Sequence, residues 1–113
     1  SDDPFVATMG KISKSIFTNG VPQGYKSKKV NKILQDTTLL QTKEVNLYNG
    51  VLYSATVLEV KNKTDKAIVL NPKDYIKFAK DTPKAISIYY ANEVNHLLPY
   101  STASVVIITK AVK

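Results

Sequence analysis

The chain has 113 residues, of which 43% are apolar, and its 16 basic and 9 acidic residues give a formal charge of +7. This length fits one domain, and the apolar fraction is too high for a disordered tail. No window holds the ~18 consecutive apolar residues of a membrane span, so we expect no membrane span, and we expect no signal peptide in this segment. The chain contains no cysteine, which excludes disulfide frameworks and thiolate metal sites. Because it starts at Ser1 without a Met, we expect a processed or excised piece of a longer protein.

The positive charge suggests anionic partners such as nucleic acid or an acidic lipid surface. However, all 16 basic residues are Lys. Arg, the usual reader of guanine and bidentate phosphate clamp, is missing. The lysines are dispersed, and the one modest cluster comprises Lys26, Lys28, Lys29 and Lys32. A solubilising surface charge is therefore favoured, and a basic nucleic-acid-binding β domain is kept as the alternative function.

The N-terminal segment has the pattern of an amphipathic helix. Asp2-Asp3-Pro4 is typical of a helix start, because acidic capping residues precede Pro at the first helical position. Apolar side chains then recur on one helical face: Phe5, Met9, Ile12 and Ile16. Gly20 supplies a stop, so we predict a helix over residues 4–18. It could pack on its own domain or dock onto a partner.

An irregular connector over residues 20–25 leads to an exposed strand over 26–33 and a strand-like stretch over 36–42. Asn49-Gly50 is the strongest short signal for a two-residue hairpin turn. It predicts strand 44–48 paired with 51–55, with Tyr48 opposite Val51 and Leu47 opposite Leu52. The second strand runs on to residue 60 as the central strand. After a turn at 62–65, residues 67–70 are predicted to complete a three-stranded meander.

That register assigns side chains to the two faces of the sheet. One face is predicted to hold Val45, Leu47, Leu52, Ser54, Thr56, Leu58 and Val60. The other is predicted to hold Tyr48, Val51, Tyr53, Ala55 and Val57, and it ends in Glu59. Both faces are partly apolar, as expected of a central strand covered on two sides.

The C-terminal half adds further strands. Asn71-Pro72 breaks the ladder, and residues 74–79 are predicted as strand or irregular. Residues 85–91 alternate, with Ile86, Ile88 and Tyr90 on one face, and 92–100 form a loop. The Val/Ile-rich residues 102–109 are predicted as a last strand buried on both faces. We expect a mainly β fold, an antiparallel β-sandwich (Ig-like or barrel-like) with an N-terminal amphipathic α-helix. Residues 1–34 would form the helix and connector, and 35–113 the β-sandwich domain.

Reaction chemistry is not indicated. His96 is the only histidine, and no triad or ligand spacing surrounds it. The acids are scattered, and the four glycines form no phosphate-binding loop. Asn62-Lys63-Thr64 matches a glycosylation sequon, but a polar hairpin loop accounts for it. We therefore predict no enzyme, no catalytic or metal-binding residues and no cofactor.

Four short elements follow one another along the chain. The first is Pro22-Gln23-Gly24-Tyr25, and the second comprises Val60, Asn62, Thr64, Leu70 and Lys73-Asp74-Tyr75. The third is Ala85-Ile86-Ser87-Ile88, and the fourth is Leu98-Pro99 followed by Ser101-Thr102. In this order they resemble TraK-type proteins of conjugative type IV secretion systems. The matching elements there are a Pro-x-Gly-Tyr element, then a strand, Asn-containing turn, strand and Asp-Phe step, then a later strand and a closing Leu-Pro-Gly turn. The resemblance covers residues 12–109, with Tyr75 in place of Phe, Tyr100 in place of Gly and Lys throughout in place of Arg.

The resemblance implies the C-terminal portion of a periplasmic, outer-membrane-associated subunit of an outer-membrane core complex. Such a β-sandwich binds a small lipoprotein and neighbouring subunits of a homo-oligomeric ring, without catalysis. A partner strand added to an exposed sheet edge would supply the contact. Because tyrosine is enriched at interfaces, the candidate interface residues are Tyr25, Tyr53, Tyr75 and Tyr90.

Overall fold

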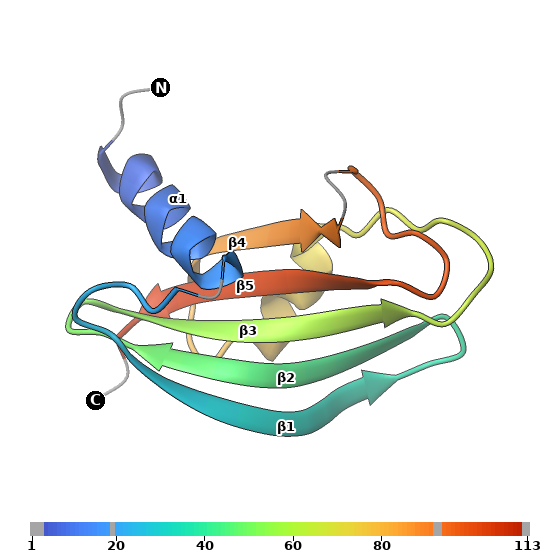
Figure 1. Ribbon diagram of the computed structural model, residues 1–113. Helices are drawn as coiled ribbons and strands as arrows, with labels where there is room; N and C mark the ends of the chain where they lie inside the picture. The colour runs from blue at the N-terminus through green and yellow to red at the C-terminus, as the bar shows by residue number, and fades with distance from the viewer. Residues whose placement is uncertain (1–3, 19, 92–93, 112–113) are drawn as a thin grey trace.

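The computed structural model describes residues 4–18, 20–91 and 94–111, with side chains from Ala7 onward. Its elements in chain order are α1 (Pro4–Phe17), β1 (Lys26–Asp36), β2 (Leu40–Asn49), β3 (Tyr53–Asn62), the 3-10 helix η1 (Pro72–Phe78), β4 (Pro83–Tyr90) and β5 (Thr102–Lys110). The strands form one antiparallel sheet of order β1-β2-β3-β5-β4 (Figure 1). The predicted mainly β antiparallel class with an N-terminal helix is confirmed.

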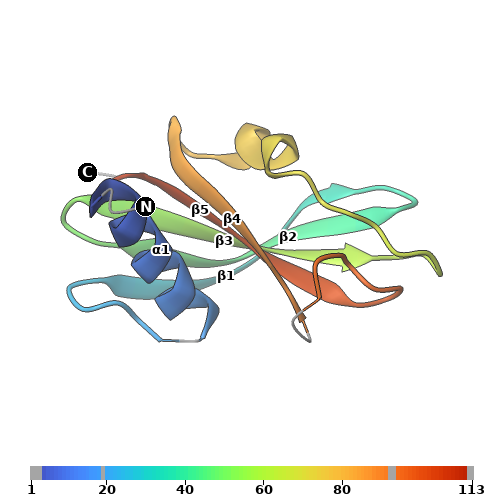
Figure 2. The same cartoon turned by 90° about the horizontal axis from the view of Figure 1, so that it is seen from above.

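The two faces of this sheet carry different covers. α1 lies on one face, and the connection from β3 to β4, which contains η1, lies on the other (Figures 1 and 2). Figure 2 also shows the strong twist of the strands. Within the described residues the strands make a single sheet, so helical and irregular segments take the place of the second sheet of a sandwich. The expected domain boundary between residues 34 and 35 falls inside β1, an edge strand of this sheet.

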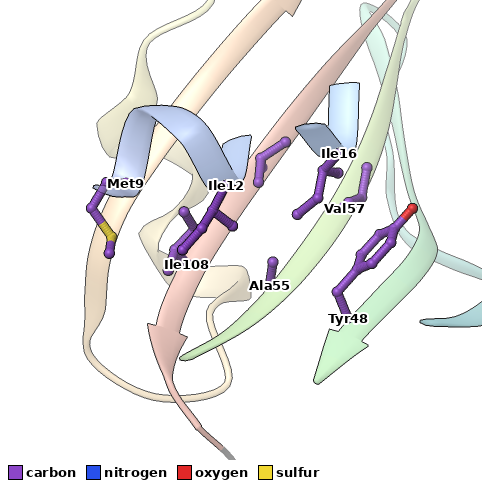
Figure 3. Packing of buried hydrophobic residues seen from close by; sticks show 8 residues of the cluster. Met9, Ile12, Ile16, Tyr48, Ala55, Val57 and Ile108 are labelled. Atoms are coloured by element: carbon purple, nitrogen blue, oxygen red, sulfur yellow. The ribbon is translucent and has the colours of Figure 1, made fainter. Parts of the chain in front are cut away.

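α1 forms because its apolar residues share one face, and that face is buried. Met9, Ile12 and Ile16 are 5%, 8% and 4% exposed, which confirms this part of the predicted stripe. The backbone N–H of Gly20 donates to the carbonyl of Ser15 at 2.8 Å just past the end of the helix. The helix packs on its own sheet rather than standing free for a partner (Figure 3). Asp2, Asp3 and the side chain of Phe5 lie outside the described residues.

One apolar cluster lies on each face of the sheet, and β5 contributes side chains to both clusters. The α1-side cluster consists of Met9, Ile12, Ile16, Tyr48, Ala55, Val57, Val106 and Ile108. The η1-side cluster consists of Leu58, Val60, Leu70, Tyr75, Leu97, Ala103, Val105 and Ile107. Successive β5 side chains point to opposite faces, and all four from Val105 to Ile108 are 0% exposed. Burial of this strand on both faces is therefore confirmed.

The predicted β2–β3 hairpin is present, but the predicted pairing register is wrong by four residues. Tyr48 lies opposite Ala55 and Leu47 opposite Thr56, and the N–H of Gly50 donates to the carbonyl of Tyr53 at 2.9 Å. Val51 and Leu52 therefore lie outside the strands, in the loop. Side chains alternate between the two faces along a strand, so a register shift of an even number of residues leaves each side chain on its face. Ala55, Val57, Leu58 and Val60 therefore lie on the predicted faces of the sheet.

Val45 lies on the face opposite to the one predicted. The register shifts between Glu44 and Asn46, and such an irregularity moves an intervening side chain across the sheet. Val45 packs against the α1-side cluster, while Glu44, 3% exposed, forms an ion pair of 2.8 Å with Lys80. This ion pair holds the end of the β3–β4 connection to the sheet.

The predicted strand over residues 67–70 is wrong. Its only ladder contact in the described part of the chain is an isolated bridge between Ile68 and Leu97. β5, rather than residues 67–70, lies next to β3 in the sheet. The three-stranded meander is therefore β1-β2-β3, and the exposed strand predicted over residues 26–33 belongs to its first strand, β1. Residues 74–79, predicted as strand or irregular, belong mostly to η1, where Asn71 caps the helix by accepting from the N–H of Lys73 at 3.0 Å. β4 is confirmed, with Ile86, Ile88 and Tyr90 packed against the η1-side cluster.

Asn62 joins three segments at the end of β3. Its side-chain amide donates to the carbonyls of Lys66 at 2.7 Å and Leu97 at 3.2 Å, and its oxygen accepts from Thr64 N–H at 2.9 Å. The residue is 0% exposed. The turn interpretation of Asn62-Lys63-Thr64 is therefore supported, since this buried amide is a structural hydrogen-bonding group.

Candidate partner interface

The four candidate tyrosines separate into two pairs on opposite faces of the sheet. Tyr25 and Tyr53 pack against the α1-side cluster, at the end of the sheet where β2 turns into β3. Tyr75 and Tyr90 belong to the η1-side cluster or pack against it. The fold therefore does not gather the four rings into one surface.

Tyr25 is held against the hairpin by the turn before it. Gly24 has a φ of +83°, a conformation that favours glycine, and the N–H of Tyr25 donates to the carbonyl of Pro22 at 3.0 Å. A Cβ on Gly50 would lie 2.6 Å from the Tyr25 ring, so the ring packs directly on the glycine backbone. Burial, with a smaller contribution from Tyr53, raises the pKa of Tyr25. Gly50 does not have the positive φ that the predicted two-residue turn requires, so the glycine of Asn49-Gly50 is needed here for close packing against Tyr25.

A groove of about 340 Å³ opens beside this pair, and we call it the hairpin-end groove. Thr8 and Ile12 of α1, residues 22–25 and residues 51–53 line it. Two neighbouring apolar side chains project from the loop: Val51 is 88% exposed and Leu52 is 71% exposed. The hairpin register predicted from sequence placed both in the ladder, so this apolar tip was missed.

The second pair has a structural task in the free domain. Tyr75 is 4% exposed, and burial, with contributions from Asp74 and Tyr90, raises its pKa to about 12. The Tyr90 hydroxyl accepts a hydrogen bond from the N–H of Leu70 at 3.1 Å. Together the two phenols fix the β3–β4 connection on the sheet.

The outer strands β1 and β4 differ in how they are protected. β1 has Lys at four positions and two interruptions of its register with β2. Its end is also tied by Lys63, whose Nζ lies 2.8 Å from Asp36 Oδ1 and lowers the pKa of that carboxyl. In β4 the one charged residue is Lys84, and the single register shift lies at its start, between Pro83 and Ala85. Lysines and bulges block strand addition, so β4 is the less protected edge.

The β1 lysines do not form one basic surface. Lys28 lies opposite Leu47 and Lys29 opposite Asn46, so these neighbours point to different faces of the sheet. Tyr89 and Tyr90 are divided in the same way, one packed on each cluster. A base-stacking platform with basic neighbours needs both kinds of side chain on one face, so this arrangement does not favour the nucleic-acid alternative.

Comparison with protein-family models matches residues 4–109 to the family described as TraK C-terminal domain. The chain belongs to this family. The match spans nearly the whole chain and confirms the resemblance drawn from the sequence. No curated protein matches the chain.

The TraK C-terminal domain is a structural family rather than an enzyme family, and its proteins relate to conjugation and type IV secretion in the bacterial cell envelope. Its members have a role in a secretion or conjugation complex. In the described part of the chain, no helix has the length and apolar character needed to cross a membrane. Among the same residues, no three His, Cys, Asp or Glu side chains are grouped to hold a metal ion. The ring of His96 has its Nδ1 3.0 Å from the Asn95 side-chain oxygen.

Two of the motifs that carry the TraK resemblance form turns that place side chains at the ends of the sheet. The Pro-x-Gly-Tyr element sets Tyr25 on the hairpin. The Leu-Pro-x element is a turn closed by the N–H of Ser101, which donates to the carbonyl of Leu98 at 3.2 Å. Tyr100, which stands at the Gly position of the Leu-Pro-Gly turn in the resemblance drawn from the sequence, has a φ of 58° and is 63% exposed.

Proposed function

We propose that this TraK-type domain is a structural subunit of the outer-membrane core complex of a conjugative type IV secretion system. It would act in the periplasm, associated with the outer membrane, by binding a small lipoprotein and neighbouring copies in a homo-oligomeric ring. The match to the TraK C-terminal domain over residues 4–109 carries this proposal. An edge strand open to pairing supplies a means of contact.

The partner segment would add as a strand along β4. Backbone hydrogen bonds give such a contact its affinity, and pockets for alternate side chains give it specificity. The side chains from Ala85 to Tyr90 are all half-buried, so each leaves surface for an added strand to cover. Phe17 stacks on Tyr89 of β4 with ring centroids 4.5 Å apart, so two aromatic rings lie at this edge of the sheet.

The four tyrosines would contribute unequally to this contact. Tyr90 is on β4 itself, so it is the first candidate. Tyr25 and Tyr53 lie at the hairpin-end groove, away from β4, so they would contribute less to a contact along this edge. Tyr75 is buried in the free domain, and a partner would reach it only if the β3–β4 connection moved.

The proposal is tested by purifying the tagged chain from the envelope together with its candidate lipoprotein. A stable complex in size-exclusion chromatography is expected, and a chain that stays monomeric beside that lipoprotein contradicts the proposal. Amide hydrogen exchange then locates the contact. Binding should slow exchange at residues 83–90 and leave residues 26–36 unchanged, so protection confined to β1 would refute the β4 edge as the docking strand.

A further inference from the structure

The tip of the β2–β3 hairpin combines exposed apolar side chains with flanking lysines. Val51 and Leu52 are 88% and 71% exposed, and Val21 of the neighbouring connector is 50% exposed. The β2–β3 loop that carries Val51 and Leu52 meets the connector before β1 at this end of the sheet (Figure 1). Contiguous exposed apolar side chains mark an interaction site, and Val51 and Leu52 form such a patch at the tip of this loop.

The charges nearest this tip are positive. Lys26 follows Tyr25 directly and lies opposite Asn49 in the sheet, and Lys110 lies opposite Tyr53. Lys11 is exposed on α1, next to Ile12 of the hairpin-end groove. None of the nine residues that line the groove is charged. The two acids of the hairpin strands, Glu44 and Glu59, pair with Leu58 and Lys43, several residues along the ladder from Asn49 and Tyr53.

We propose that this tip inserts into the headgroup region of an anionic phospholipid bilayer. Apolar side chains enter the interface while lysines around them contact acidic headgroups, which is the composition of interfacial anchors. Lys also fits this place because its long stem lies along apolar surface while its ammonium stays among the headgroups. A patch of two or three side chains is too small for a stable protein interface, which buries roughly 1,200 Å² or more. The inference is independent of partner binding at β4.

The chain contains no Trp, so a single introduced Trp reports insertion without background. The probes are Leu52→Trp and, as a matched control, Val69→Trp, since Val69 is 77% exposed on the β3–β4 connection. Each is titrated with vesicles of phosphatidylcholine alone and of phosphatidylcholine with an equal part of phosphatidylglycerol. The Leu52→Trp emission should shift to the blue with the anionic vesicles only, and Val69→Trp should not shift.

Binding strength is then measured by sedimentation with the same vesicles. Val51→Ser with Leu52→Ser should weaken binding about tenfold or more, because both apolar contacts are lost. Lys26→Gln and Lys110→Gln should each weaken it about fivefold, and added salt should weaken the unchanged chain as well. Val69→Ser should bind as the unchanged chain does. Unchanged thermal unfolding of the variants excludes a folding defect.

Three results would overturn the inference. The first is a Leu52→Trp emission that stays constant at every vesicle concentration. The second is an equal shift of Val69→Trp, which would mean adsorption through charge alone. The third is a shift without vesicles that grows with protein concentration, which would mean that a second copy covers the tip. Co-purification with envelope proteins can succeed or fail independently of all three.

Discussion

At the scale of single residues, Tyr100 occupies a backbone position that suits glycine. Its φ of 58° lies at the third position of a turn that begins at Leu98 and has Pro99 second, as in a type II turn. An L-residue in this left-handed region is strained by about 1–2 kcal/mol. Glycine adopts this conformation without that strain, because it has no Cβ.

Tyr100→Gly should therefore raise the free energy of unfolding, measured in urea. Relief of the strain exceeds the roughly 0.4–1 kcal/mol of extra freedom that Gly brings to the unfolded chain, so we expect a gain of about 0.5–1 kcal/mol. Tyr100→Ala is the control, because it removes the ring and keeps the strain, and it should bring no gain. If both variants lose stability equally, the exposed ring makes a contribution that outweighs the turn.

Tyr75 should make the domain sensitive to high pH. Burial raises its folded-state pKa to about 12 from the ordinary tyrosine value of 10.0, so the folded state keeps its proton after the unfolded chain has lost it. The contribution to stability is fully present below pH 10 and is lost as the pH rises toward 12. Urea unfolding across this range should show a steeper fall for the unchanged chain than for Tyr75→Phe. Parallel curves would mean that Tyr75 ionises equally in both states.

At the scale of elements, β1 illustrates how an exposed edge is kept from pairing. Its sequence has four lysines and none of its side chains is buried, yet it forms 11 residues of strand. Lysines on an edge strand repel a second copy that approaches in register. We expect that replacing Lys26, Lys28, Lys29 and Lys32 by Thr increases self-association, measured by light scattering at rising concentration.

A matched variant separates edge protection from net charge. Replacing four exposed lysines that lie outside both edge strands by Thr removes the same charge: Lys61, Lys66, Lys73 and Lys77. This variant should stay as soluble as the unchanged chain. Equal association of the two variants would show that total charge, rather than its position on the edge, prevents aggregation.

Local patterns predicted the elements well, and distant contacts decided the rest. The helical stripe of α1 and the alternation in β4 need only their own sequence, and both were confirmed. Residues 67–70 read as a strand, but β5 pairs with β3 through residues 102–110 and leaves no place for them. The turn at Asn49-Gly50 was expected to be tighter than it is. The groove is built from residues 8 and 12 of α1, residues 22–25 and residues 51–53, and no pattern within one segment indicates that these three segments meet.

At the scale of the whole molecule, the domain has two apolar cores, one on each face of the same sheet. Val106 and Ile108 of β5 face the α1-side cluster, while Val105 and Ile107 face the η1-side cluster. The β3–β4 connection makes this possible, because it crosses the sheet on the face opposite to α1. Each proposed contact surface belongs to a different part of this design. The hairpin tip depends on α1 and its connector, and the β4 edge depends on both clusters.

The two cores should contribute to stability almost independently. Ile16 is 4% exposed in the α1-side cluster and Leu97 is 1% exposed in the η1-side cluster, so each substitution to Ala should cost about 2–5 kcal/mol in urea unfolding. Because the two side chains share no cluster, the double variant should lose the sum of the single losses to within about 0.5 kcal/mol. Ile76→Ala, at a half-exposed position of η1, is the control and should cost far less. A double loss that departs from the sum by more than about 1 kcal/mol would show that β5 transmits packing changes between the faces, so that partner binding at β4 could alter the hairpin end.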